Sequence, residues 1–153
     1  MVLYVPRSYE TFFFCVFVFC TKPTGECMAS SKTILLVDDS ATSRLMHRTL
    51  ISQKTGYEVI CAADGAQALR VIATTTPDLI LMDVMMPILD GLEVCRRIRQ
   101  DERTRKVPVI LLTFRTDANS VKLGFDSGCN EYLKKPVEES QLLQVLSTYL
   151  AQN

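Results

Sequence analysis

The sequence predicts a doubly wound α/β domain in residues 32–153, with a five-stranded parallel sheet and helices on both faces. Short apolar runs rich in β-branched residues alternate with stretches whose apolar residues recur at helical spacing. The central runs are almost continuously apolar, which is typical of strands buried on both faces of a parallel sheet. Strands that alternate with helices are joined by right-handed crossovers, and these place helices on both faces.

The expected strands are the short apolar runs, taken in chain order. β-branched and aromatic residues recur in these runs, and such residues are enriched in strands. The runs are TILLV (33–37), YEVIC (57–61), DLILM (78–82), VPVILL (107–112) and NEYLK (130–134).

The expected helices lie between and after these strands and are marked by capping residues. Asp39 and Ser40 precede the first helix and Asp90 precedes the third, as is typical of helix starts. Gly56 and Gly128 stand where helices should stop. The helices are expected over 41–54, 65–74, 91–100, 117–127 and 138–151, and the last has one apolar stripe: Leu142, Leu143, Val145, Leu146 and Leu150.

Composition excludes several classes of protein. The chain has 153 residues, which predicts one domain, and its 48% hydrophobic and 22% charged residues exclude a disordered or collagen-like chain. Lys plus Arg and Asp plus Glu number 17 each, so the net charge is zero. A direct nucleic-acid binder or an anionic-membrane binder would show a basic excess, so neither is expected.

Three cysteines of the predicted domain, Cys61, Cys95 and Cys129, are widely spaced. They form no CxxC motif and have no nearby histidine pair, so neither a zinc site nor a disulfide framework fits them. We interpret them as small apolar residues in a reducing cytosol, which predicts a cytoplasmic protein.

Residues 1–31 are predicted to be an N-terminal extension outside the fold. The apolar run TFFFCVFVFC at 11–20 has about ten residues, whereas a membrane-spanning helix needs roughly 20. No small-residue cleavage site follows the run, and Met28 opens MASSKTILLVDDS, which looks like a complete start of the domain. We therefore expect residues 1–27 to be an upstream extension from a misassigned start codon. A weak membrane or export segment, and a segment packed on the domain, stay open as alternatives.

Reactive side chains follow four of the five strands, at the edge of the sheet where ligands bind in this fold class. Asp38 and Asp39 follow the first strand, Asp83 the third, Thr113 the fourth and Lys135 the fifth. Three converging carboxylates repel one another and favour a bound cation, and hard oxygen ligands suit Mg²⁺. A lysine and a threonine hydroxyl opposite them would stabilise the negative charge on a phosphoryl group during its transfer. The pattern predicts an aspartate nucleophile, Asp83.

Four motifs in this order resemble the receiver domain of two-component response regulators: ILLVDDS, LILMDVMMPILDG, ILLT and YLKKP. The resemblance covers about residues 33–151. It implies a flavodoxin-like receiver fold with strand order 2-1-3-4-5 and Asp83 as the phosphoacceptor. It also implies Mg²⁺ or Mn²⁺ bound by Asp38, Asp39, Asp83 and the backbone carbonyl of Met85.

The resemblance also implies how such a domain is used. The phosphoryl donor would be a sensor histidine kinase or a histidine phosphotransfer protein. Thr113 and Tyr132 would be switch residues, with Tyr132 turning inward on phosphorylation and altering a surface that binds a downstream protein. Lys135 precedes Pro136 through a bond that is usually cis in the family. Because the fifth helix ends near the last residue, the chain resembles stand-alone, chemotaxis-type receivers. These are signalling proteins with only self-phosphorylation and self-dephosphorylation chemistry, and no stable membrane insertion is expected.

Phe114 departs from the family pattern, which generally has a small residue after the threonine. Its ring is predicted to shield the phosphorylation site. The competing interpretation is an outward ring that contacts a partner. Phe114 also leaves open the alternative that the chain is a phosphorylation-independent protein-interaction module on the same fold.

Other polar and apolar residues near the motifs are given structural roles. His47 is expected to be a surface or packing residue and not a phosphocarrier, Met86 is expected to pack, and Lys134 is expected to face solvent. A stripe of four residues is expected in the core: Ile88, Leu92, Val94 and Ile98.

Three other functions on related folds fit the residues less well. A dinucleotide-binding domain needs glycines after the first strand, where this chain has DDSATSR. A flavodoxin needs a hydroxyl-rich phosphate loop there, and adjacent aspartates would repel that phosphate. A phosphatase with an aspartate nucleophile has its DxDx motif on the first strand rather than the third.

Overall fold

The computed structural model describes residues 31–151 and has the predicted alternation of strands and helices. Every predicted element is present, with bounds that differ by no more than two residues. The predicted extension over 1–31 lies, apart from Ser31, outside the described residues and stays a prediction. In chain order the elements are β1 (Thr33–Val37), α1 (Ala41–Thr55), β2 (Glu58–Ala62), α2 (Gly65–Thr74), β3 (Leu79–Asp83), α3 (Gly91–Gln100), β4 (Val109–Thr113), α4 (Ala118–Asp126), β5 (Glu131–Lys134) and α5 (Glu139–Leu150).

The five strands form one parallel sheet in the order β2-β1-β3-β4-β5, which confirms the predicted fold. β1 lies between β2 and β3, and Val37 at the end of β1 is paired with Met82 of β3. The chain adds β2 on one side of β1 and β3 on the other side. The carboxyl ends of β1 and β3 therefore flank the switch point where ligands bind in open α/β sheets.

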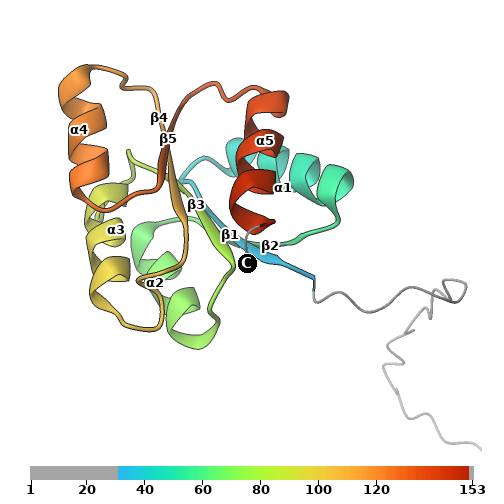
Figure 1. Cartoon of the computed structure of the whole chain (residues 1–153), viewed down its shortest axis with the longest axis horizontal. Coiled ribbons are helices and arrows are strands. Elements are labelled where there is room, and N and C mark those ends of the chain that lie inside the picture. The colour runs from blue at the N-terminus through green and yellow to red at the C-terminus, as the bar shows by residue number, and fades with distance from the viewer. Residues whose placement is uncertain (1–30, 152–153) are drawn as a thin grey trace, which may run out of the picture.

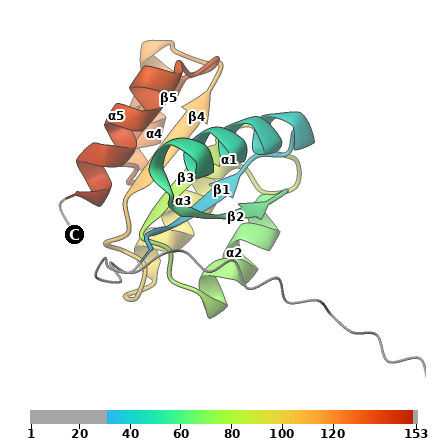
Figure 2. The same cartoon turned by 90° about the vertical axis from the view of Figure 1, so that its right-hand side faces the viewer.

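Helices cover both faces of the sheet. α2, α3 and α4 lie on one face, and α1 and α5 lie on the other (Figures 1 and 2). Successive side chains of a strand point to opposite faces. Leu35 and Val37 accordingly belong to the core under α2 and α3, whereas Ile34 and Leu36 belong to the core under α1 and α5.

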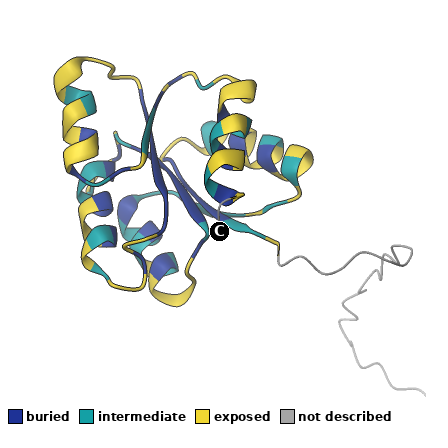
Figure 3. Cartoon of the chain, viewed as in Figure 1, coloured by how far each residue is buried: buried dark blue, intermediate teal, exposed yellow. Residues whose placement is uncertain are grey.

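The central strands are the most deeply buried part of the molecule (Figure 3). All five residues of β3 and all five of β4 are buried, as expected for strands covered by helices on both faces. Within the described residues, no helix is long and apolar enough to span a membrane.

The fourth strand begins two residues later than predicted because its first residues belong to a turn. The Val107 N–H donates to the Thr104 carbonyl at 2.9 Å. Pro108 has no N–H to donate, and the Val109 N–H donates to the Asn130 side chain. The Thr104–Val107 turn thus sets the start of β4.

The prediction that Ile88 belongs to a core stripe is wrong. Ile88 is 94% exposed and has φ of +72°, a left-handed conformation that β-branched residues rarely adopt. It lies in the connection before α3, so helical spacing does not apply to it. Val94 and Ile98, inside α3, are buried, and Leu92 is half-buried.

The predicted helix boundaries and cysteine environments agree with the structure. Ser40 and Asp90 cap α1 and α3 through their side chains. Gly56 and Gly128 follow α1 and α4 with φ of +70° and +92°. Three cysteines in the described part of the chain are free thiols, half-buried or buried: Cys61, Cys95 and Cys129.

Candidate functional site

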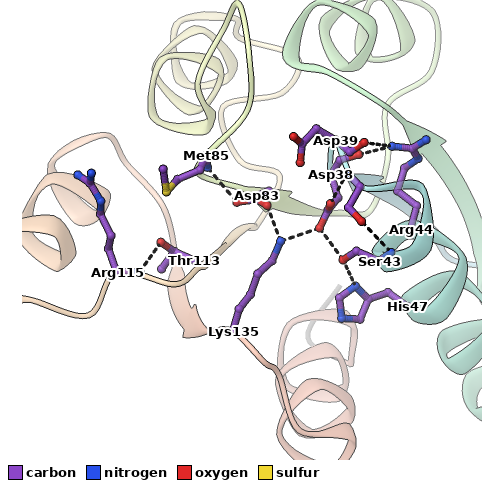
Figure 4. Close-up of polar contacts among 11 residues, drawn as sticks. Asp38, Asp39, Ser43, Arg44, His47, Asp83, Met85, Thr113, Arg115 and Lys135 are labelled. Atoms are coloured by element: carbon purple, nitrogen blue, oxygen red, sulfur yellow. Dashed lines mark hydrogen bonds and ion pairs between the residues drawn. The ribbon is translucent and has the colours of Figure 1, made fainter.

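Three carboxyl groups meet at the carboxyl ends of β1 and β3 (Figure 4). Asp38 and Asp39 directly follow β1, and Asp83 is the last residue of β3. One oxygen atom from each carboxyl group lies within 4.8 Å of the other two. Because β1 and β3 are adjacent and parallel, their ends bring together side chains more than 40 residues apart in sequence.

Asp38 is fully buried, and three hydrogen bonds hold its carboxylate. The Ser40 N–H donates to Oδ1 at 2.9 Å, and the Ser43 hydroxyl and the Lys135 ammonium each donate to Oδ2 at 2.7 Å. Burial raises the pKa of Asp38, but these donors together outweigh burial, and the pKa lies below its ordinary value. Asp38 is therefore an ionised group in a fixed orientation.

Lys135 bridges two of the carboxyl groups from the end of β5. Its buried ammonium donates to Asp38 and to Asp83 Oδ2. Burial lowers the pKa of Lys135, but the two carboxylates outweigh burial and raise it above its ordinary value. Lys135 thus supplies a permanent positive charge beside Asp83.

Asp83 is positioned by the backbone around it. Its Oδ1 accepts a hydrogen bond from the Met85 N–H at 2.9 Å, which ties the carboxylate to the backbone that follows β3. Gly91, at the start of α3, packs directly on this strand end, since a β-carbon at Gly91 would lie 2.3 Å from the Asp83 carbonyl oxygen. The close approach of α3 to β3 therefore requires glycine here.

Asp39 is the carboxyl group that faces outward. It is exposed, and its carboxylate makes no hydrogen bond with any residue that the structure describes. The backbone beside it is held by Arg44, whose guanidinium donates to the carbonyls of Asp38 at 2.5 Å and Asp39 at 3.0 Å. Three hard oxygen donors, one of them open to solvent, are a donor set that fits Mg²⁺.

Thr113 lies on the other side of Asp83 from Asp38, at the end of β4 (Figure 4). It is buried, and its hydroxyl oxygen accepts a hydrogen bond from the Arg115 N–H at 3.0 Å. The Lys135 N–H donates to the Thr113 carbonyl at 2.7 Å, which ties the ends of β4 and β5 together. Lys134 faces solvent, as predicted, and Lys135 faces the cleft.

Phe114 lies at the mouth of the cleft. Its ring is 68% exposed, and the Lys135 ammonium lies 5.7 Å from the ring centroid. The ring lines a groove of about 440 Å³ together with the site carboxyl groups and with Met46, Pro136 and Val137. One wall of the cleft is thus apolar and open to solvent.

Tyr132 links β5 to the connection that follows β4. Its ring is half-buried and lines a second groove of about 440 Å³ with Met85, Arg115 and Leu123. The Tyr132 hydroxyl donates to the Arg115 carbonyl at 3.0 Å. The aromatic residue predicted to be a switch therefore contacts the segment that also holds the Thr113 hydroxyl.

His47 and Met86 are both buried, as expected for packing residues. His47 Nδ1 lies 3.5 Å from the Ser43 hydroxyl oxygen, and burial lowers the pKa of the histidine. The ring thus supports Ser43 and does not reach the carboxyl cluster itself.

Sequence reasoning missed three residues that hold the site: Ser43, Arg44 and Gly91. Ser43 and Arg44 lie in the first turn of α1, five or six residues after Asp38. The polar residues in the first helical turn after the DDS motif could have indicated Ser43 and Arg44, because that turn begins next to the end of β1. Gly91 follows the predicted capping residue Asp90, but its contact with the Asp83 backbone depends on how α3 packs.

Residues 34–147 match the family model of the response regulator receiver domain. Among curated proteins, the transcriptional regulatory protein AfsQ1 of Streptomyces coelicolor is 44% identical over 105 residues, which are 69% of this chain and 44% of AfsQ1. The DNA-binding response regulator MtrA of Mycobacterium tuberculosis is 37% identical over 120 residues, which are 78% of this chain and 51% of MtrA. The chain thus spans about half the length of these curated relatives.

Solved structures match over nearly their whole length. The chemotaxis protein CheY4 of Vibrio cholerae has a TM-score of 0.75 and 33% identity, with 79% of this chain and 100% of CheY4 covered. The receiver domain of the sensor histidine kinase PA1611 of Pseudomonas aeruginosa has a TM-score of 0.74 and 34% identity, with 80% and 99% covered. That structure was solved with a magnesium ion coordinated in its active-site cleft.

Proposed function

Since the chain belongs to the response regulator receiver family, we propose that it accepts a phosphoryl group on the Asp83 carboxylate and signals by changing a protein-binding surface. The observation that carries the proposal is the cluster of Asp38, Asp39 and Asp83, with oxygens within 4.8 Å of one another and Lys135 bridging two of them. A carboxylate beside a fixed cation and a hydroxyl is equipped to attack phosphorus.

In the proposed transfer, an Asp83 carboxylate oxygen attacks the phosphorus of a phosphohistidine. The new oxygen–phosphorus bond forms as the nitrogen–phosphorus bond breaks, and the imidazole leaves with the electron pair. The Lys135 ammonium and the Thr113 hydroxyl stand on two sides of Asp83 and stabilise negative charge on the transferred group. The phosphoryl donor is a sensor histidine kinase or a histidine phosphotransfer protein.

We assign the metal to the same cleft, with Mg²⁺ or Mn²⁺ held by Asp38, Asp39, Asp83 and the backbone carbonyl of Met85. Asp39, exposed and without a hydrogen bond to any described residue, offers the most open oxygen atoms. When bound, the divalent cation neutralises charge on the phosphoryl oxygens. Lys135 already offsets part of the charge of Asp38 and Asp83, so Asp39 supplies most of the remaining attraction for a cation.

We propose that output passes through protein contacts, as in a single-domain, chemotaxis-type receiver, and not through direct nucleic-acid binding. The similarity to CheY4 over its full length supports this reading. AfsQ1 and MtrA are a transcriptional regulator and a DNA-binding regulator, but the chain covers only about half of each. The output surface would be formed by α4, β5 and α5, next to Tyr132.

Intact-protein mass spectrometry after incubation with acetyl phosphate and MgCl₂ tests the proposal. The full chain should gain the mass of one phosphoryl group, EDTA should prevent the gain, and Asp83→Asn should show none. Asp90→Asn is the matched control, because it alters an exposed carboxyl group in the same connection and still caps α3. A wild-type chain that gains no phosphoryl group from acetyl phosphate or from a phosphorylated kinase would instead indicate a phosphorylation-independent interaction module.

We assign to Phe114 the role of a partial shield of the phosphorylated site. Phe114→Ala should shorten the lifetime of the phosphorylated form, because attacking water must approach in line with the bond that breaks. Phe125→Ala is the control, since it removes an exposed ring from α4 that lines neither groove. An unchanged lifetime together with weaker binding of a partner would assign Phe114 to the partner contact instead.

A further inference from the structure

A glycine in the last turn of α4, Gly124, is buried against the ring of Tyr132. A β-carbon at Gly124 would lie 2.7 Å from Cδ2 and 2.8 Å from Cε2 of that ring, and 3.6 Å from Leu111 Cδ1. The first two distances are shorter than any van der Waals contact allows. The Tyr132 ring therefore occupies the space that a side chain at position 124 would need.

The backbone of α4 does not itself require a glycine at this position. Gly124 has no positive φ, and the helix is ended by Ser127 and by Gly128, which is left-handed. Glycine also weakens a helix relative to alanine. Glycine at 124 is thus explained by the neighbouring ring and not by the helix.

The same ring is held at its other end by the connection between β4 and α4. The Tyr132 hydroxyl donates to the Arg115 carbonyl, and the Arg115 N–H donates to the Thr113 hydroxyl oxygen, each at 3.0 Å. The backbone of Arg115 therefore joins the Tyr132 hydroxyl to the threonine at the cleft. Both contacts that hold the ring are made by the chain's own backbone, and neither involves Asp83.

We infer that Gly124 is a positioning residue that forms a slot for Tyr132, so that α4 itself favours the half-buried ring position of the structure over a ring turned to solvent. Phosphorylation of Asp83 then adds to an equilibrium that the slot has already biased. The part of this inference that concerns phosphorylation rests on the proposed function, and the slot does not.

A double-mutant cycle in the full chain tests whether the ring requires glycine. Gly124→Ala should lower the urea midpoint in the wild-type background, because the new β-carbon meets the ring. The same change should raise the midpoint in the Tyr132→Ala background, where only the gain in helix propensity is left. Asn119→Ala, at an exposed position of α4, should act alike in both backgrounds. A midpoint raised by Gly124→Ala in both backgrounds would overturn the slot.

Fluorine NMR of the chain labelled with 3-fluorotyrosine tests the position of the ring directly. The chain has five tyrosines, and Tyr132→Phe identifies the resonance of Tyr132. Gly124→Ala should move that resonance towards the solvent-exposed value, and a resonance left in place would refute the inference. Acetyl phosphate with Mg²⁺ should then move it back towards the wild-type position, and its failure to do so in chains that mass spectrometry shows to be phosphorylated would also refute the inference. If no phosphoryl group is taken up, the proposed function fails, and the spectra without donor still decide the slot.

Discussion

Asp39→Asn is expected to stabilise the metal-free chain and to remove most of its stabilisation by Mg²⁺. Asn has nearly the shape of Asp, so the change removes a charge and little packing. Asp39 is exposed, so water screens its interactions, and two unit charges 4.8 Å apart in water interact by about 0.9 kcal/mol. Asp39 faces two carboxyl groups, and Lys135 offsets roughly one of them. The net repulsion relieved is therefore on the order of 1 kcal/mol.

Urea unfolding followed by circular dichroism measures both effects. With a slope of about 2 kcal/mol per molar urea, 1 kcal/mol corresponds to a rise of about 0.5 M in the midpoint in the presence of EDTA. Excess MgCl₂ should raise the midpoint of the wild type, because a ligand that binds only the folded state stabilises it. The variant should show a much smaller rise, since it has lost the carboxylate most open to the cation.

Glu102→Gln is the matched control, because it removes one exposed carboxylate from the turn after α3, far from the cluster in the fold. It should change neither the midpoint in EDTA nor the rise with MgCl₂. A lower midpoint of Asp39→Asn in EDTA, or a full wild-type rise of the variant's midpoint with Mg²⁺, would contradict the assigned role of Asp39.

Three further predictions concern individual residues. Ile88→Asn should raise the free energy of unfolding by about 1 kcal/mol, because asparagine tolerates the left-handed φ and the exposed isoleucine side chain is not packed. Gly91→Ala should lower it by about 2 kcal/mol and reduce phosphorylation, since the new β-carbon meets the Asp83 carbonyl. Iodoacetamide at pH 8 should modify Cys61 before Cys129, as read by peptide mass mapping, because Cys129 is buried and burial raises its pKa to about 11.

Each of these predictions has an outcome that contradicts it. An unfolding free energy of Ile88→Asn at or below that of the wild type would mean that the left-handed isoleucine carries no strain. Full phosphorylation of Gly91→Ala would show that the end of β3 tolerates displacement. Alkylation of Cys129 at the same rate as Cys61 would indicate that the end of α4 opens readily in solution.

The order of strands and helices and the residues gathered at the cleft were predictable from the sequence. Spacing of apolar residues records which face of each segment is buried, and a parallel sheet places the residue after each strand at one edge. Asp38, Asp83 and Lys135 could therefore be assigned to the same edge although the first and last are 97 residues apart. Their chemical types then favoured a site for a cation and a phosphoryl group, which stays a prediction.

The contacts between segments were decided only by the tertiary structure. Spacing suggested that Ile88 continues the apolar stripe of α3, but the chain leaves β3 through a left-handed turn and exposes that side chain. Two further features depend on how the helices pack on the sheet. These are the hydrogen bonds from Arg44 to two carbonyls and the contact of the Tyr132 ring with Gly124. Local periodicity determines which face of a helix is buried. It does not record the close approaches between two packed elements that leave room only for glycine, because these depend on how the elements pack against each other.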